Sequence, residues 1–195
     1  MIKVSIGVPS NRLIQPKTAE CLMTLVAHGG YEFHFVVASE GYTVAENRNY
    51  IAVKALNYKS DYLLFIDDDM TFPHDLLDSL IAVDKDIVGV AYHPRSETGK
   101  IIKFLDETHT VRLEETDDPK YKVPFKCHAT GTGIVLIKTY IFMKVPRPWF
   151  DFIFNENGSC AKGEDWYFCE KAAKSGFEIW TEPRIKVGHI GDIIL

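Results

Sequence analysis

The feature that most constrains the fold is a short apolar run, 61–66 (DYLLFI), which ends at three adjacent aspartates, Asp67, Asp68 and Asp69. A run of this length and composition is typical of a strand that is buried on both faces. Such strands occur in parallel sheets that helices cover on both sides. The run therefore predicts an α/β fold, with the three aspartates at the carboxyl end of an inner strand.

The surrounding segments repeat the same alternation. Strand-like segments occur at 2–8, 31–38 and 86–92. Helix-like segments separate them, at 16–29, 44–58 and 73–83. This alternation predicts a mostly parallel sheet with right-handed crossovers, flanked by helices. The polar stretch 95–125 predicts a small antiparallel hairpin and a mobile loop. Further along we expect strands at 133–138, 177–181 and 184–189 and a helix at 164–176.

Composition sets limits on the class of protein. A chain of 195 residues with 46% hydrophobic and 25% charged residues fits a single domain, 1–195. The net charge of -5 argues against general binding to a nucleic acid backbone. The sequence has neither a secretory signal pattern nor the run of about 18 apolar residues that a membrane span needs. We therefore expect a cytoplasmic protein, in the host cytoplasm if it is viral, with four free cysteines.

The triple aspartate predicts a metal site. Three adjacent carboxylates repel one another, and a divalent cation such as Mg²⁺ or Mn²⁺ relieves that repulsion. In an extended segment Asp67 and Asp69 would point to one side and Asp68 to the other, so Asp67 and Asp69 are the expected ligands. The alternative is that Asp69 or Thr71 caps the helix that follows Pro73.

Two further positions each have a chemical and a structural interpretation. His189 lies between two glycines in VGHIG, where it is either a ligand of the same cation or a structural histidine. Glu164 and Asp165 open a predicted helix. They either stabilise its N-terminus or include a general base that takes a proton from an acceptor hydroxyl.

The remaining candidates are binding residues. Arg48 and Asn49 lie on the second predicted helix, either as contacts to a base, ribose or diphosphate or as ordinary exposed residues. The glycines of Gly131-Thr132-Gly133 allow a ligand to approach the backbone closely, although the GK[ST] ending of a phosphate loop is absent. One aromatic cluster either stacks on a sugar ring or packs in the core: it comprises Trp149, Phe150 and Phe152.

Taken in order, seven segments resemble the GT-A glycosyltransferases, and within them the family 2-like enzymes, including short viral and bacterial forms. The segments are SIGVPS, ENRN, FIDDDM, GTGIVLIK, PWFDF, GEDWYFCEKA and VGHIG. FIDDDM and GEDWYFCEKA are specific as a pair, and the resemblance covers the chain from about Val4 to Gly191. It implies a GT-A fold, a UDP- or GDP-sugar donor, an acceptor hydroxyl and Mn²⁺ or Mg²⁺.

The resemblance also implies roles for individual residues. Asp67 and Asp69 look like the DXD motif, His189 like a late metal ligand, and Glu164-Asp165 like the acidic motif that includes the base. Together with the arguments above, it gives these predicted contacts to the nucleotide sugar: Pro9, Ser10, Arg12, Glu40, Arg48, Asn49, Asp67, Asp68, Gly131, Thr132 and Gly133. The identities of the sugar, the acceptor and the oligomer are left open, as is the choice between inversion and retention.

Two other functions compete with glycosyl transfer. A nucleotidyltransferase would be expected to have a glycine-rich basic loop after the first strand, but PSNRLIQPK contains no glycine. A non-catalytic module that binds a nucleotide sugar would not need Glu164-Asp165 to face the donor.

Overall fold

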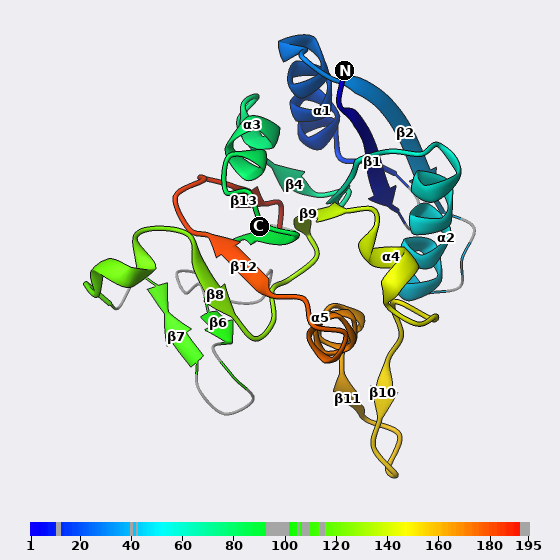
Figure 1. The fold of residues 1–195 in the computed structure, drawn as a ribbon, viewed down its shortest axis with the longest axis vertical. Helices are drawn as coiled ribbons and strands as arrows, with labels where there is room; N and C mark the ends of the chain where they lie inside the picture. Colours follow the sequence, from blue (N-terminus) through cyan, green and yellow to red (C-terminus); the bar gives the residue numbers. More distant parts are fainter. Residues whose placement is uncertain are drawn as a thin grey trace.

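The computed structural model describes residues 1–10, 13–39, 41, 43–92, 102–104, 106, 110–113 and 116–191. Its centre is a seven-stranded sheet with the strand order β2-β1-β3-β9-β5-β12-β8 (Figure 1). The strands are β1 (Lys3–Pro9), β2 (Glu32–Ala38), β3 (Tyr62–Ile66), β5 (Ile87–Val90), β8 (Phe125–Cys127), β9 (Ile134–Lys138) and β12 (Ile179–Glu182). Five of them share one direction, and only β8 and β9 run against it. The predicted mostly parallel sheet is confirmed.

Strand β9 joins the two halves of this sheet. It pairs antiparallel with β3 on one side and with β5 on the other. Its first residue, Ile134, lies opposite Ile66, the last residue of β3. Because β9 runs in the opposite direction, the loop before it lies beside the aspartates that follow β3, at the carboxyl ends of the parallel strands.

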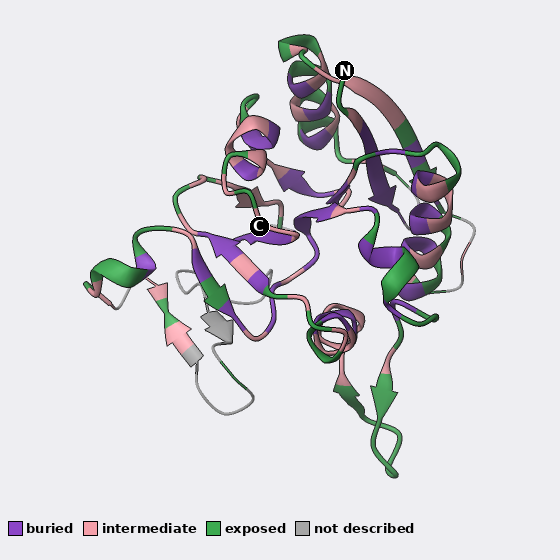
Figure 2. Ribbon diagram, in the orientation of Figure 1, coloured by how far each residue is buried: buried purple, intermediate pink, exposed green. Residues whose placement is uncertain are grey.

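Helices cover both faces of the sheet (Figure 1). On one face lie α1 (Pro16–His28) and α3 (Leu76–Ile81), and on the other lie α2 (Val44–Asn57), α4 (Ile141–Lys144) and α5 (Glu164–Lys174). The side chains of β9 alternate between the two apolar clusters, with Leu136 in the first and Val135 in the second. The inner strands are therefore buried on both sides, as their apolar runs predicted (Figure 2).

The helix ends follow local sequence signals, with one exception. Pro16 opens α1, and Gly29, with φ +83°, ends it. The exception is α3, which is shorter than the predicted 73–83 and begins after Asp75 at its N-cap. Since the helix starts that late, the alternative in which Asp69 or Thr71 caps it is wrong.

Three short antiparallel pairs extend the fold: β4 (Met70–Thr71) with β13 (Gly188–His189), β6 (Ile102–Phe104) with β7 (Thr110–Arg112), and β10 (Ile153–Phe154) with β11 (Cys160–Lys162). The β6–β7 pair confirms the predicted hairpin, while the loop predicted beside it falls partly outside the described residues. Of the strand predicted at 184–189, only the last two residues form β13. None of the described helices has the length and apolar character to cross a membrane. All four cysteines are free, and Cys160 is the exposed one.

Candidate functional site

The three aspartates form a turn whose backbone is held by three distant segments. Asp67 N donates to Gly133 O at 2.8 Å, Gln15 N donates to Asp68 O at 2.8 Å, and Ile190 N donates to Asp69 O at 2.8 Å. Met70 N also donates to Asp67 O at 3.3 Å, which closes the turn. The extended conformation assumed from the sequence is therefore wrong, and the side chains of Asp67 and Asp69 have different partners.

Arg48 connects the aspartate turn to the two other predicted motifs. Its side chain is only 2% exposed. Nη2 donates to Asp67 Oδ1 at 2.7 Å, Nη1 to Thr132 O at 3.3 Å and Nε to Glu164 Oε1 at 3.4 Å. Burial alone would lower the pKa of Arg48, but Asp67 and Glu164 outweigh it and raise that pKa. Arg48 is therefore a buried cation that fixes two carboxylates, not the exposed helix residue of the alternative interpretation.

Glu164 and Asp165 occupy the first turn of α5, as predicted. Burial of Glu164 raises the pKa of its carboxyl group, against the opposing effect of Arg48. Asp165 Oδ1 accepts a hydrogen bond from Trp166 N at 2.7 Å. The two acids therefore have different environments: Glu164 faces the buried guanidinium, and Asp165 accepts a hydrogen bond from the next backbone amide of its own helix.

Tyr92, just after β5, is a site residue that the sequence analysis missed. Its hydroxyl accepts a hydrogen bond from Gly133 N at 3.0 Å, and its ring stands edge-on to His189 with centroids 5.8 Å apart. A Cβ atom at either Gly131 or Gly133 would overlap this side chain. The close approach that these glycines permit is thus made by a tyrosine. Burial, followed by the nearby Asp67 carboxylate, raises the pKa of Tyr92.

Asp69 and His189 meet at the edge of the site. Asp69 Oδ2 and His189 Nε2 are 3.1 Å apart, with side chains 4% and 14% exposed. The pairing of β13 with β4, which places His189 opposite Met70, brings them together. The carboxylate of Asp69 is a ligand that Mg²⁺ and Mn²⁺ prefer, and a neutral imidazole is a common metal ligand. Within the described part of the chain, however, no three His, Cys, Asp or Glu side chains are grouped as a metal site.

The other predicted contacts that the structure describes lie nearby or have structural partners. Pro9 ends β1, and Ser10 follows it, buried, with its N donating to Ala38 O at 2.9 Å. Arg12 and Glu40 lie outside the described residues. The amide of Asn49 bonds the backbone of Trp149 and Phe150, which gives Asn49 a structural role.

No family model and no curated protein matches this chain in sequence. Its fold is shared with two solved structures. One, A197 from STIV, aligns with a TM-score of 0.66 and 19% identity over 98% of this chain and 87% of that chain. The other, the inositol-1-phosphate CTP transferase from T. maritima, aligns with a TM-score of 0.53 and 15% identity over 99% of this chain and 90% of that chain.

A third structure is less similar. A glycosyltransferase involved in the glycosylation of the major capsid of PBCV-1 aligns with a TM-score of 0.40 and 16% identity, over 75% of this chain and 69% of that chain. Because the first two structures are only 19% and 15% identical to this chain, their similarity shows a shared fold and nothing about function.

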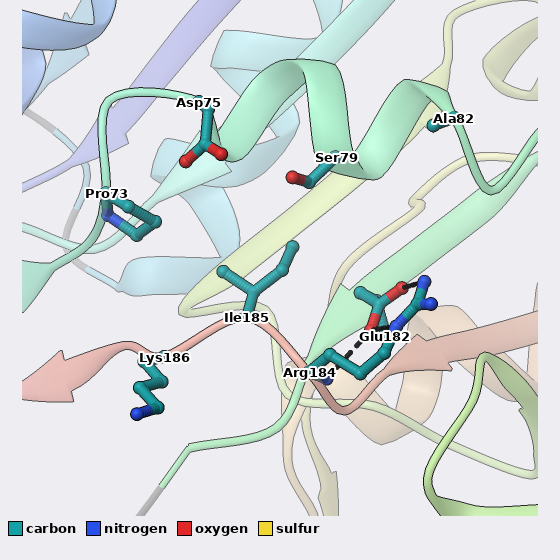
Figure 3. Close-up of a pocket in the computed structure, with 8 residues that line it drawn as sticks. All are labelled: Pro73, Asp75, Ser79, Ala82, Glu182, Arg184, Ile185 and Lys186. Carbon is teal, nitrogen blue, oxygen red and sulfur yellow. Dashed lines mark hydrogen bonds and ion pairs between the residues drawn. The ribbon is translucent and has the colours of Figure 1, made fainter.

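A pocket of about 360 Å³ lies away from these motifs, between α3 and the segment that connects β12 to β13 (Figure 3). Asp75 and Ser79 lie on the helix side, and Ile185 lies opposite them. On the same wall Arg184 is paired with Glu182, whose side chain is 1% exposed. None of the predicted site residues lines this pocket.

The aromatic cluster was predicted either to stack on a sugar ring or to pack in the core. Trp149 and Phe150 are buried, so the core interpretation holds for these two residues.

Proposed function

We propose that this protein is a metal-dependent glycosyltransferase of the GT-A type, which moves a sugar from a nucleoside-diphosphate sugar to an acceptor hydroxyl. The observation that supports this most is the position of Arg48, which contacts Asp67, Thr132 O and Glu164 at once. The aspartate motif, the glycine loop and the acidic pair are far apart in the sequence. A single buried cation joins all three at the carboxyl edge of the sheet, where ligands of such folds bind.

The proposed cation is Mn²⁺ or Mg²⁺, held by Asp69 and His189, with Asp67 as a further ligand or as a contact to the donor. Bound there, it would neutralise charge on the leaving diphosphate. Tyr92 holds His189 from the side, and the hydrogen bonds to the aspartate backbone fix Asp67 and Asp69 in place. The residues of this chain thus supply a preformed turn and one oriented imidazole.

The acidic pair provides the proposed general base. A carboxyl group whose pKa is raised by burial accepts a proton more readily near neutral pH, which suits Glu164 to this role. Asp165 is the alternative base. A module that only bound nucleotide sugars would not require either acid beside the donor, so their position favours an enzyme.

The test measures donor binding and turnover in parallel. We expect a UDP- or GDP-sugar to raise the melting temperature only when Mn²⁺ is present. Without an added acceptor, the same mixture should release nucleoside diphosphate slowly as the sugar is transferred to water. Asp69→Asn and His189→Ala should each abolish the Mn²⁺-dependent shift. Asp84→Asn, which changes an acid with an 89% exposed side chain, is the matched control and should behave like the wild type.

One competing activity is tested in a parallel assay with other substrates. The fold similarity to a CTP transferase makes nucleotidyl transfer the main alternative. Release of pyrophosphate from a nucleoside triphosphate and a sugar or polyol phosphate would support nucleotidyl transfer and overturn the proposed glycosyl transfer. Full metal-dependent turnover by Asp69→Asn would overturn the metal assignment alone.

A further inference from the structure

Strand β2 forms one edge of the central sheet, and the only described strand that pairs with it is β1 (Figure 1). Two backbone hydrogen bonds reveal its orientation: Glu32 N donates to Ile2 O, and Ser10 N donates to Ala38 O, both at 2.9 Å. The N–H and C=O groups of one strand residue point to the same side, and successive residues alternate. The even-numbered residues of β2 therefore face β1. Phe33, Phe35 and Val37 direct their backbone groups outward.

The side chains of these three residues share one face of the sheet, because they alternate along the strand. Phe35 is 46% exposed and Val37 is 52% exposed, while Phe33 packs against the apolar cluster under α1. Edge strands are commonly protected from association by lysine, proline or a bulge. The segment 33–38 (FHFVVA) has neither residue, and its register with β1 is unbroken. Among the described residues, this edge is thus regular, apolar from Phe33 to Ala38 apart from His34, and without these three protective features.

The strand is also complementary to a reversed copy of itself. If a second β2 pairs antiparallel with Phe35 opposite Phe35, then Phe33 of each copy lies opposite Val37 of the other. In this register all the outward N–H and C=O groups of the three residues are opposite partners, so each finds a hydrogen bond. The same register places phenyl against phenyl and phenyl against a β-branched side chain, which are favourable cross-strand pairs.

We propose that the protein forms a two-fold symmetric homodimer through β2, which continues the central sheet from one copy into the next. The occupant is a second copy because one register satisfies both the outward backbone groups and the exposed side chains. A closed two-fold pair also removes this edge, because β2 of each copy then has a neighbour on both sides. This inference does not depend on the proposed enzymatic activity.

Cysteine cross-linking tests the register. In a Cys160→Ser background, which removes the exposed native thiol, Phe35→Cys places two thiols across the symmetry axis. A directly opposite hydrogen-bonded pair has Cα atoms about 5.5 Å apart, within disulfide range. Val37→Cys is the matched control: it is as exposed as Phe35, but it faces Phe33 of the other copy. We expect oxidation to yield a covalent dimer for Phe35→Cys only. Equal cross-linking of both variants, or of neither, would overturn the proposal.

Sedimentation analysis tests the association itself. We expect the wild type to shift from monomer to dimer with concentration, and Phe35→Lys to remain monomeric because it sets two like charges opposite each other. Phe154→Lys, at a residue 62% exposed on the β10–β11 hairpin, should dimerise like the wild type. A circular dichroism spectrum like that of the wild type would confirm that Phe35→Lys folds. A wild type that stays monomeric at every concentration would refute the dimer.

Discussion

At the scale of single residues, the position of Glu164 has a consequence for stability. Because burial raises the pKa of this carboxyl group, the folded protein binds its proton more tightly than the unfolded chain does. Ionising Glu164 therefore costs the folded state free energy. That cost is absent below the ordinary glutamate pKa, about 4.3, and grows until the pH passes the raised pKa.

Glu164→Gln should remove this cost. We expect the variant to be more stable than the wild type at about pH 7, with the difference shrinking toward about pH 4, as measured by urea denaturation in metal-free buffer. Glu178→Gln is the control with the opposite sign, because a hydrogen bond from Lys126 lowers the pKa of Glu178. A stability difference for Glu164→Gln that does not change with pH would contradict the prediction.

The sequence predicted which residue types gather at the site better than it predicted what they touch. Asp67 and Glu164 are acidic wherever they lie, so their chemistry can be recognised in the sequence. The partner of both is Arg48, whose burial depends on the packing of α2 against β1 and β3. Tyr92 was within reach of the same reasoning, since it ends the predicted strand 86–92 at the edge where ligands bind.

At the scale of elements, the helices and strands of the first half could be predicted closely because apolar periodicity and proline or glycine signals mark them. The direction of β9 could not, since GIVLIK reads the same in a parallel or an antiparallel strand. Long-range pairing also decides β13, where only Gly188 and His189 find a partner in β4. The order of elements was therefore predictable, while the site geometry required the sheet pairing.

The link between α2 and the segment before β10 gives a prediction at this scale. Asn49 Oδ1 accepts from Trp149 N at 3.0 Å and from Phe150 N at 3.2 Å. Asn49→Ala leaves both amides without this acceptor and should lower the free energy of unfolding by about 2–3 kcal/mol in chemical denaturation. Asn57→Ala, at the exposed end of the same helix, should change it by less than about 0.5 kcal/mol. Equal effects would show that Asn49 is not a structural link.

At the scale of the whole molecule, β9 makes one cooperative unit of two half-sheets. The half formed by β2, β1 and β3 meets the half formed by β5, β12 and β8 only through β9 among the described strands. The side chains of β9 also pack into both apolar clusters. A defect in β9 should therefore weaken both halves together, although its cavity lies on one face.

Leu136→Ala tests this coupling. Leu136 is 2% exposed, and its truncation should cost about 2–5 kcal/mol. In hydrogen exchange read by mass spectrometry, we expect peptides from β1 and β3 to lose the same protection free energy as peptides from β5 and β12, because both exchange through global unfolding. Phe154→Ala should leave these peptides unchanged, since its side chain is exposed on the β10–β11 hairpin. If only one half lost protection, the halves would be separate units, and the site would lie between two bodies free to unfold separately.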